Sequence, residues 1–217
     1  GKGFQVATQM AAEVTGITED KVNVLSTQDT DVSPFDTGAY ASRQTYVSGM
    51  AVKKTGAIFK EKILDYAAYM LEKPQDTLDV RDNHIVDKET GTQLLPMEEL
   101  ATTAFYSLDR SVHITAEATS HCKTNTFATG ACFAEVEVDI PLCKVKLVNM
   151  INVHDCGRLI NPALAAAQVH GGMSMAIGYG LSEQLLYDKK TGRPLNNNLL
   201  DYKLSTTMDH PPYATLC

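Results

Sequence analysis

Apolar residues recur at helical spacing in several parts of the chain. Near the N-terminus they lie three or four residues apart, at Phe4, Val6, Ala7, Met10, Ala11 and Val14. This spacing predicts a helix, and Gly16 follows it as a natural C-terminal stop. A longer amphipathic pattern over 44–73 predicts a second helix that ends before Pro74. A short helix is expected over 96–107, with Pro96 near its first turn.

Other parts of the chain alternate between apolar and polar residues, which is typical of strands. The segment 77–87 reads as two short strands around a turn at Asp82-Asn83. Four further strands are predicted over 21–27, 112–119, 130–139 and 144–153, the last two joined by a turn that contains Pro141. Between the first two helices, 29–44 is expected to form an extended loop.

A last helix is predicted to begin at Asn161-Pro162, with asparagine as its cap and proline at its first position. Helices and strands are therefore partly segregated along the chain, which indicates an α+β fold. The length of 217 residues fits one large domain or two small ones, with possible subdomains over 1–110 and 111–217. The chain begins Gly-Lys-Gly without methionine, which suggests a piece of a longer protein.

Composition and charge exclude several classes of protein. Charged residues make up 21% of the chain and hydrophobic residues 44%, which is ordinary for a globular protein. The net charge of -7 and the lack of a basic run argue against nucleic-acid binding. No apolar run approaches the roughly 20 residues that a membrane span needs. Five cysteines without a Cys-x-x-Cys pair favour a reducing cytoplasm.

The last predicted helix contains four glycines, although a glycine inside a helix costs about 1 kcal/mol relative to alanine. They are Gly171, Gly172, Gly178 and Gly180. Close packing against a second helix is one explanation. The other is a ligand that approaches the backbone, because a capped helix start attracts anions and Gln168 offers an amide that both donates and accepts.

The segment 36–46 is a second candidate, because small residues leading into a helix can present successive backbone N–H groups to an anion. The alternative is a surface loop in which Ser42 caps the helix. Metal and nucleophile sites are less well supported. The spacing of His121-Cys122 and of 154–156 does not match structural zinc patterns, and no base can be assigned to Cys156. Glutamates in 130–139 alternate onto what reads as a solvated sheet face.

Five segments together resemble the molybdenum-binding subunit of the xanthine dehydrogenase / aldehyde oxidase (molybdenum hydroxylase) family, and within it the bacterial xanthine dehydrogenase type. The segment 155–188 resembles the family's closing signature, Asp-x-Gly-x-x-x-Asn-Pro, then Gly-Gln-x-x-Gly-Gly, then Gly-x-Gly and a glutamate. The strand over 129–139 resembles its Gly-Ala-His-x-Ala-Glu-Val-Glu-Val-Asp. The segments 11–17, 29–52 and 197–211 match in the family's order and spacing.

The resemblance implies that 1–217 is a partial C-terminal molybdopterin-binding domain. Gln168 falls where the family has a glutamine that contacts the cofactor. The residues that fall on the loop around the pterin and its phosphate are Tyr40, Ala41, Ser42, Arg43 and Gln44. Gly1, Lys2 and Gly3 fall on a Gly-Gln-Gly motif whose glutamine approaches the molybdenum ligands. Three positions depart from the family: Lys2 replaces glutamine, Cys132 replaces histidine and Ala167 replaces glycine.

The family hydroxylates purines, other N-heterocycles or aldehydes with oxygen from water. Electrons leave through iron–sulfur clusters and usually flavin (FAD), which other domains or subunits carry. The family's catalytic glutamate lies in a Gly-x-Gly-Glu motif beyond the position of Pro212, so no catalytic residue and no metal ligand is assigned here. The resemblance thus implies an inactive fragment of a cytoplasmic oxidoreductase of purine metabolism. The alternatives are a non-catalytic cofactor-binding or assembly module, and a carbon monoxide dehydrogenase or hydroxybenzoyl-CoA reductase relative.

Overall fold

The computed structural model describes residues 2–25, 29–31, 35 and 38–216, without the side chains of Lys2 and Tyr213. It divides into two compact units, 1–126 and 127–217. The division falls after Thr126, whereas the sequence suggested a boundary after residue 110. Each unit is described separately.

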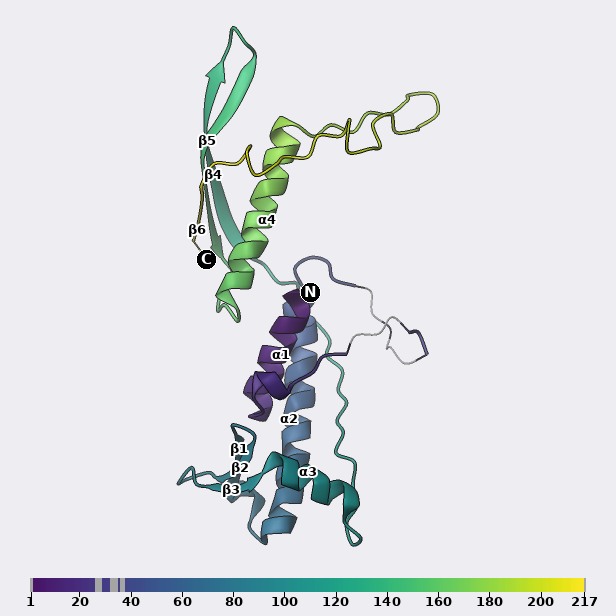
Figure 1. Cartoon of the computed structure of the whole chain (residues 1–217), viewed down its shortest axis with the longest axis vertical. Helices are drawn as coiled ribbons and strands as arrows, with labels where there is room; N and C mark the ends of the chain where they lie inside the picture. The colour runs from purple at the N-terminus through teal and green to yellow at the C-terminus, as the bar shows by residue number, and fades with distance from the viewer. Residues whose placement is uncertain (1, 26–28, 32–34, 36–37, 217) are drawn as a thin grey trace. The chain divides into compact units, whose positions relative to one another are not determined.

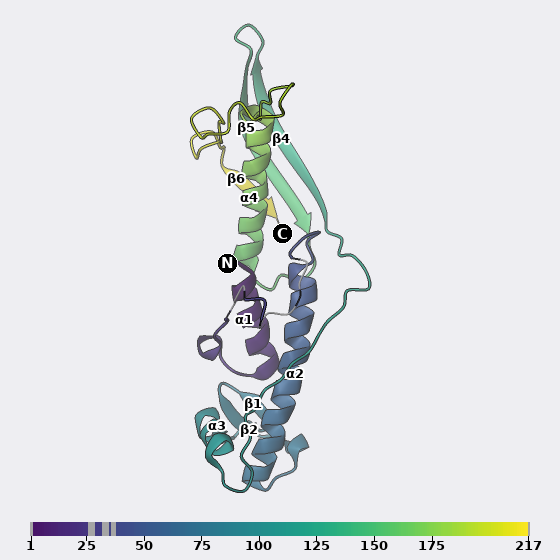
Figure 2. The same cartoon turned by 90° about the vertical axis from the view of Figure 1, so that its right-hand side faces the viewer.

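The first unit is organised around one long helix, α2 (Gln44–Leu71). Helix α1 (Lys2–Thr15) lies alongside its first half in both views (Figures 1 and 2). Two glycines of α2 allow this approach. A Cβ atom at Gly49 would lie 2.8 Å from the sulfur of Met10, and one at Gly56 would lie 3.0 Å from Cγ1 of Val14.

The second half of α2 carries a small antiparallel sheet and a short helix. The strands β1 (Leu78–Arg81), β2 (His84–Asp87) and β3 (Gln93–Pro96) lie side by side in that order, and α3 (Met97–Tyr106) follows them. Asp82 and Asn83 both have positive φ angles, 46° and 61°, as a two-residue hairpin turn requires. Single 3-10 turns occur at Glu19–Lys21 and Gln75–Thr77.

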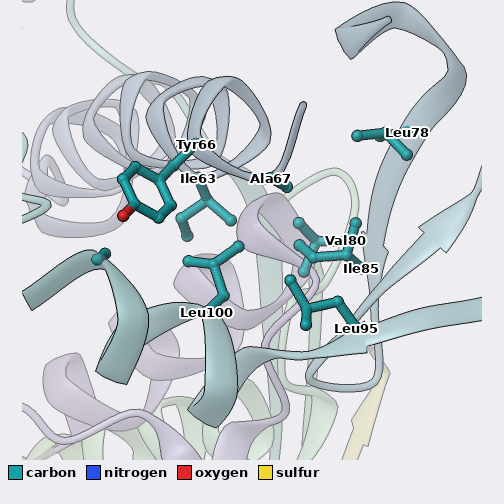
Figure 3. Packing of buried hydrophobic residues seen from close by; sticks show 9 residues of the cluster. Ile63, Tyr66, Ala67, Leu78, Val80, Ile85, Leu95 and Leu100 are labelled. Atoms are coloured by element: carbon teal, nitrogen blue, oxygen red, sulfur yellow. The ribbon is translucent and has the colours of Figure 1, made fainter. Parts of the chain in front are cut away.

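The core of the first unit lies between α2, the sheet and α3. Figure 3 shows its apolar side chains converging from all three. Tyr66 is only 1% exposed, and its hydroxyl donates to the backbone oxygen atoms of Thr103 and Arg110 at 3.3 and 3.1 Å. The other buried members are Ile63, Ala67, Leu78, Val80, Ile85, Leu95, Leu100 and Ala104. The buried tyrosine thus keeps a partner for its one polar group, as burial requires.

The end of α1 is fixed to the β1–β2 hairpin by Gly16 and Asn83. Gly16 has a φ of +78°, and a Cβ atom there would collide with the backbone carbonyl of Val80. The Asn83 side chain accepts from the backbone N–H of Thr18 at 2.9 Å and donates to its hydroxyl at 2.6 Å. A residue with a side chain at position 16 would force the two elements apart.

The second unit is a sheet with one helix packed on it. Strands β4 (Thr129–Asp139) and β5 (Lys144–Asp155) form a long antiparallel hairpin, and β6 (Tyr213–Leu216) adds parallel to β5. Helix α4 (Pro162–Leu181) follows β5, and its buried Met173 and Ile177 pack on Met150 of that strand. Only these three residues form its buried apolar cluster, so much of α4 and all of β4 stay exposed.

The predicted α+β fold is confirmed, with the expected helices, the hairpin over 77–87 and the hairpin over 130–153. Two predicted strands are wrong. Residues 21–25 leave a 3-10 turn and pair with no strand, and 112–119 has no strand partner in the described structure. Alternation shows which residues could face a core, whereas a strand also needs a neighbour to pair with. Strands β3 and β6 were not predicted, and both have only four residues.

Replacing Gly16 by alanine should lower the free energy of unfolding by about 2–4 kcal/mol, because left-handed strain and the collision with Val80 add together. Gly91→Ala is the matched control, since its φ is +72° but the nearest atom to an added Cβ, Nη1 of Arg81, is 4.0 Å away. It should cost only about 1 kcal/mol. Urea unfolding followed by circular dichroism measures both, and equal losses would contradict the close approach.

Candidate functional site

Helix α2 begins without a capping side chain. Its N-cap residue is Arg43, which accepts the first intrahelical bond from Val47 at 2.8 Å but makes no side-chain cap, and no acidic residue lies in the first turn. The proposed capping role of Ser42 is therefore not observed. The first N–H groups of a helix have no intrahelical partner and carry the positive end of the helix dipole. This end is suited to an anion.

The residues just before α2 turn the backbone sharply. Ala41 and Ser42 both have positive φ angles, 50° and 57°, and both are exposed. The Thr126 hydroxyl donates long hydrogen bonds to their carbonyl oxygens, at 3.5 and 3.4 Å. Consecutive residues in such conformations expose backbone groups that flank the helix start.

Arg43 adds a fixed positive charge at the same place. Its Nη1 donates to the Tyr40 hydroxyl at 2.5 Å, and its guanidinium carbon lies 4.7 Å from the centre of the Tyr40 ring. The tyrosine therefore orients the guanidinium at the start of α2 through both contacts. Gln44, the first residue of the helix, is exposed. The start of α2 thus combines the N–H groups of a helix end with a guanidinium that Tyr40 orients, which fits a phosphate.

Helix α4 begins as the sequence predicted. The Asn161 side chain accepts from the backbone N–H of Leu164 at 3.0 Å, and Pro162 occupies the first turn. Gln168 lies in the second turn on an exposed face, and its amide makes no hydrogen bond with any described residue. One primary amide with donors and an acceptor is therefore available beside the helix.

The four glycines of α4 do not share one explanation. A Cβ atom at Gly171, Gly172 or Gly180 would meet no atom of the described chain within 4 Å. At Gly178, in contrast, it would collide with the Glu183 carboxylate. Gly178 is therefore explained by packing inside this unit. Gly171 and Gly172 lie three and four residues after Gln168, on the same helix face, and leave open space beside its amide.

Glu183 has a structural role at the end of α4. Its Oε2 accepts from the Tyr202 hydroxyl at 2.7 Å, and its backbone N–H donates to the carbonyl of Gly178 at 2.8 Å. The hydrogen bond to Glu183 raises the pKa of Tyr202 to about 12. The buried Asn196 supports the same region by binding the backbone at Leu186 and Gln184. Nothing in the sequence indicated that Tyr202 would meet Glu183, because nineteen residues separate them.

The site residues predicted from the sequence are divided between the two units. Gly1 lies outside the described residues. Lys2 and Gly3 open α1, and the side chain of Lys2 is not described. The segment 40–44 and the start of α1 belong to the first unit, whereas Gln168 belongs to the second. The structure therefore describes two separate candidate sites, one in each unit, and each is called a half-site below because it holds only some of the candidate residues.

No metal or nucleophile site emerges among the described residues. They contain no group of three His, Cys, Asp or Glu side chains that could hold a metal ion. Cys132 and Cys156 are exposed free thiols. Glu137 and Asp139 lie on an exposed sheet face opposite Lys146 and Lys144, where opposite charges across the strands stabilise the hairpin.

Known proteins match the chain over nearly its whole length. The family of molybdopterin cofactor-binding domains matches residues 1–211. The xanthine dehydrogenase molybdenum-binding subunit of Escherichia coli O157:H7 is 45% identical over 207 residues, which are 95% of this chain and 28% of that subunit. The carbon monoxide dehydrogenase large chain of Hydrogenophaga pseudoflava is 28% identical over 218 residues, or 99% of this chain and 27% of that one.

The structure agrees with the sequence matches. The quinoline 2-oxidoreductase of Pseudomonas putida 86 superposes with a TM-score of 0.82 at 25% identity, over 97% of this chain and 27% of that one. The chain therefore belongs to the molybdopterin cofactor-binding domain family. The resemblance to molybdenum hydroxylases of the bacterial xanthine dehydrogenase type is confirmed. The chain spans little more than a quarter of the relatives it matches. Among the described residues, no helix is both long and apolar enough to cross a bilayer.

The Tyr202–Glu183 hydrogen bond predicts a tyrosine whose hydroxyl ionises at a higher pH than usual. Because the pKa of Tyr202 is raised from 10 to about 12, the bond stabilises the fold fully below pH 10, and this stabilisation is lost as the pH rises toward 12. Absorbance titration of tyrosinate in the native chain and in Tyr202→Phe isolates this group by difference. Glu183→Gln should move its midpoint back toward the ordinary value. A component near pH 10 in the native chain would contradict the geometry.

Proposed function

We propose that this chain is the cofactor-binding part of a molybdenum hydroxylase that oxidises a purine or related N-heterocycle with oxygen from water. The observation that carries the proposal is the 45% identity to a bacterial xanthine dehydrogenase molybdenum-binding subunit over 95% of the chain. An aldehyde substrate would place the enzyme in the same class of molybdenum hydroxylases. The exposed half-sites support the cofactor assignment, because both offer polar groups to a ligand outside the chain.

The first half-site suits the anionic end of the cofactor. The guanidinium of Arg43 belongs to the N-cap residue of α2, so an anion bound at the helix start would interact favourably with the helix dipole and with this charge. Tyr40 orients Arg43, and the turn at Ala41 and Ser42 exposes the backbone. We assign these residues to the pterin phosphate. The segment Gly1 to Gly3 is proposed to lie near the molybdenum, with Lys2 in place of the family's glutamine.

The second half-site suits the flat, polar part of the cofactor. The Gln168 amide donates and accepts, as the polar edge of a pterin would require. Gly171 and Gly172 leave open space beside this amide, so a planar group can approach the helix backbone. When bound, the molybdenum cofactor supplies the redox centre of the hydroxylation. The residues of this chain bind and orient it.

The isolated chain is proposed to be inactive. The catalytic glutamate is expected outside these residues, and no catalytic residue is assigned to this chain. Activity would require the rest of the molybdenum subunit, together with iron–sulfur and FAD-containing domains or subunits in the cytoplasm. Turnover of a purine by the isolated 217-residue chain would overturn this part of the proposal.

A carbon monoxide dehydrogenase relative is the second candidate, because such a large chain is 28% identical over 99% of this chain. The higher identity to the xanthine dehydrogenase subunit favours hydroxylation. A non-catalytic binding or assembly module is the third. Molybdenum and pterin content of the complete purified polypeptide separates them. Near-stoichiometric cofactor with purine oxidation supports the proposal, oxidation of carbon monoxide supports the second candidate, and a folded protein without cofactor supports the third.

Gln168→Ala in the complete polypeptide should weaken cofactor retention about three- to tenfold, since it removes one or two hydrogen bonds to the ligand. The fold should be unaffected, because the amide bonds to no described residue. Gln184→Ala is the matched control, an exposed glutamine in the same unit. Molybdenum per polypeptide after dialysis is the measurement. Equal retention in both variants would reject the role of Gln168.

Gly172→Ala should separate stability from cofactor binding. In the chain alone it should raise the free energy of unfolding by about 0.5–1 kcal/mol, because the added methyl group meets no atom and alanine favours a helix. In the complete polypeptide it should lower molybdenum content, because the methyl group enters the space beside Gln168. Gly180→Ala, equally open but eight residues further along α4, should stabilise the helix without this loss. Full cofactor content in both would contradict the proposed position.

A further inference from the structure

Residues 113–122, called the strap below, follow α2 along its length. The teal trace lies beside that helix in both views (Figures 1 and 2). The Lys62 ammonium donates to the carbonyl of Thr115 at 2.6 Å, and Lys54 donates to that of Thr119 at 3.4 Å. Ile114 packs on the core of the first unit. The strap therefore runs antiparallel to α2 and is fixed to it at three points.

The spacing of these contacts shows that the strap is extended. Lys54 and Lys62 are eight residues apart on the helix, a rise of about 12 Å. Thr115 and Thr119 are four residues apart, and four residues of a fully extended strand span about 13 Å. Only strand-like backbone lets two carbonyls this close in sequence meet both lysines.

Side-chain burial alternates along the strap as it does in a strand. Even-numbered residues face the helix and are half-buried: Ile114, Ala116, Ala118, Ser120 and Cys122. Odd-numbered residues are exposed: His113, Thr115, Glu117, Thr119 and His121. The period-2 pattern of 112–119 in the sequence is thus present in space, although no partner strand accompanies it.

The two edges of the strap differ. In an extended chain the N–H and C=O of one residue point to one edge, and those of the next residue point to the other. The lysines occupy the odd-numbered edge at Thr115 and Thr119. No N–H of the strap donates to a backbone carbonyl within the described part of the chain. The even-numbered edge is therefore bare, and neither proline nor a bulge protects it.

We propose that this bare edge, formed by the N–H and C=O groups of Ile114, Ala116, Ala118 and Ser120, receives an extended strand from the rest of the molybdenum subunit. The inference rests on the proposed function, which makes the chain part of that subunit. The matched relatives have almost three-quarters of their length beyond the region they share with this chain. One strand of that length would add to the edge by main-chain hydrogen bonds, with the lysines holding the strap straight.

Hydrogen exchange at single-amide resolution tests the pairing in the complete subunit against the isolated chain. In the complete subunit, the amides of Ile114, Ala116, Ala118 and Ser120 should exchange at least about tenfold more slowly, as hydrogen-bonded amides do. Those of Thr115, Glu117 and Thr119 should change little. If both sets of amides are equally protected, the strap is covered by protein without strand pairing. If neither set is protected, no strand pairs with it. Either result overturns the proposal. Protection that rises with the concentration of the isolated chain means pairing between two copies, which overturns the named partner.

Proline substitutions provide the matched test, because proline lacks the N–H that the proposed bond needs. Ala118→Pro removes a donor from the bare edge, and Glu117→Pro removes one from the lysine edge. In the isolated chain both variants should keep the unfolding temperature of the native sequence, since neither N–H has a backbone partner there. In the complete subunit Ala118→Pro alone should abolish the protection of the neighbouring even-numbered amides. Equal effects of the two variants would overturn the edge assignment.

Molybdenum content of the same samples keeps this proposal separate from the function. A subunit with full molybdenum content and unprotected even-numbered amides rejects the strand pairing alone. A subunit with protected amides and no molybdenum in the native form keeps the pairing and rejects the cofactor assignment.

Discussion

The start of α2 sets the main electrostatic constraint on the first unit. The helix dipole is positive there, and the first N–H groups have no partner within the helix. A helix of 28 residues needs the N–H groups of its first turn satisfied, and within the described part of the chain α2 has no capping side chain and no acidic residue in that turn. Arg43 adds positive charge where the dipole is already positive. An anion bound at this end of α2 would interact favourably with both the helix dipole and the guanidinium. The rest of α2 is, in contrast, well supported by its neighbours.

Each face of α2 has a different partner, which explains its length. Gly49 and Gly56 admit α1, and Ile63 and Tyr66 form the core with the sheet and α3. Lys54 and Lys62 bind the strap. The helix start is thereby held rigidly relative to the core of its own unit. Binding groups on a rigid element lose little conformational entropy when a ligand arrives, which suits a tightly held cofactor.

Local signals in the sequence predicted the elements that local interactions decide. Asn161-Pro162 predicted the start of α4, and the structure shows the asparagine cap. Asp82-Asn83 predicted a hairpin because both residues tolerate positive φ. Long-range pairing could not be predicted in the same way. Strand β6 pairs with a strand some sixty residues earlier, and the alternation of 112–119 describes a strand whose partner is absent from the described chain. The period-2 alternation is present in the burial of these side chains, whereas the predicted strand is not.

The candidate site, too, could be predicted only in part from the sequence. Motif resemblance indicated Gln168 and the segment 40–44, but only coordinates show that Arg43 stacks on Tyr40 and that Gln168 stands beside open space. The glycines illustrate the point most clearly. From sequence, Gly171, Gly172 and Gly178 have the same character, yet of these three an added Cβ atom at Gly178 alone would meet the chain itself, at the Glu183 carboxylate. Gly171 and Gly172 are required by nothing in the described chain. Since a helical glycine is costly, these two positions fit the proposed approach of a ligand from outside the chain.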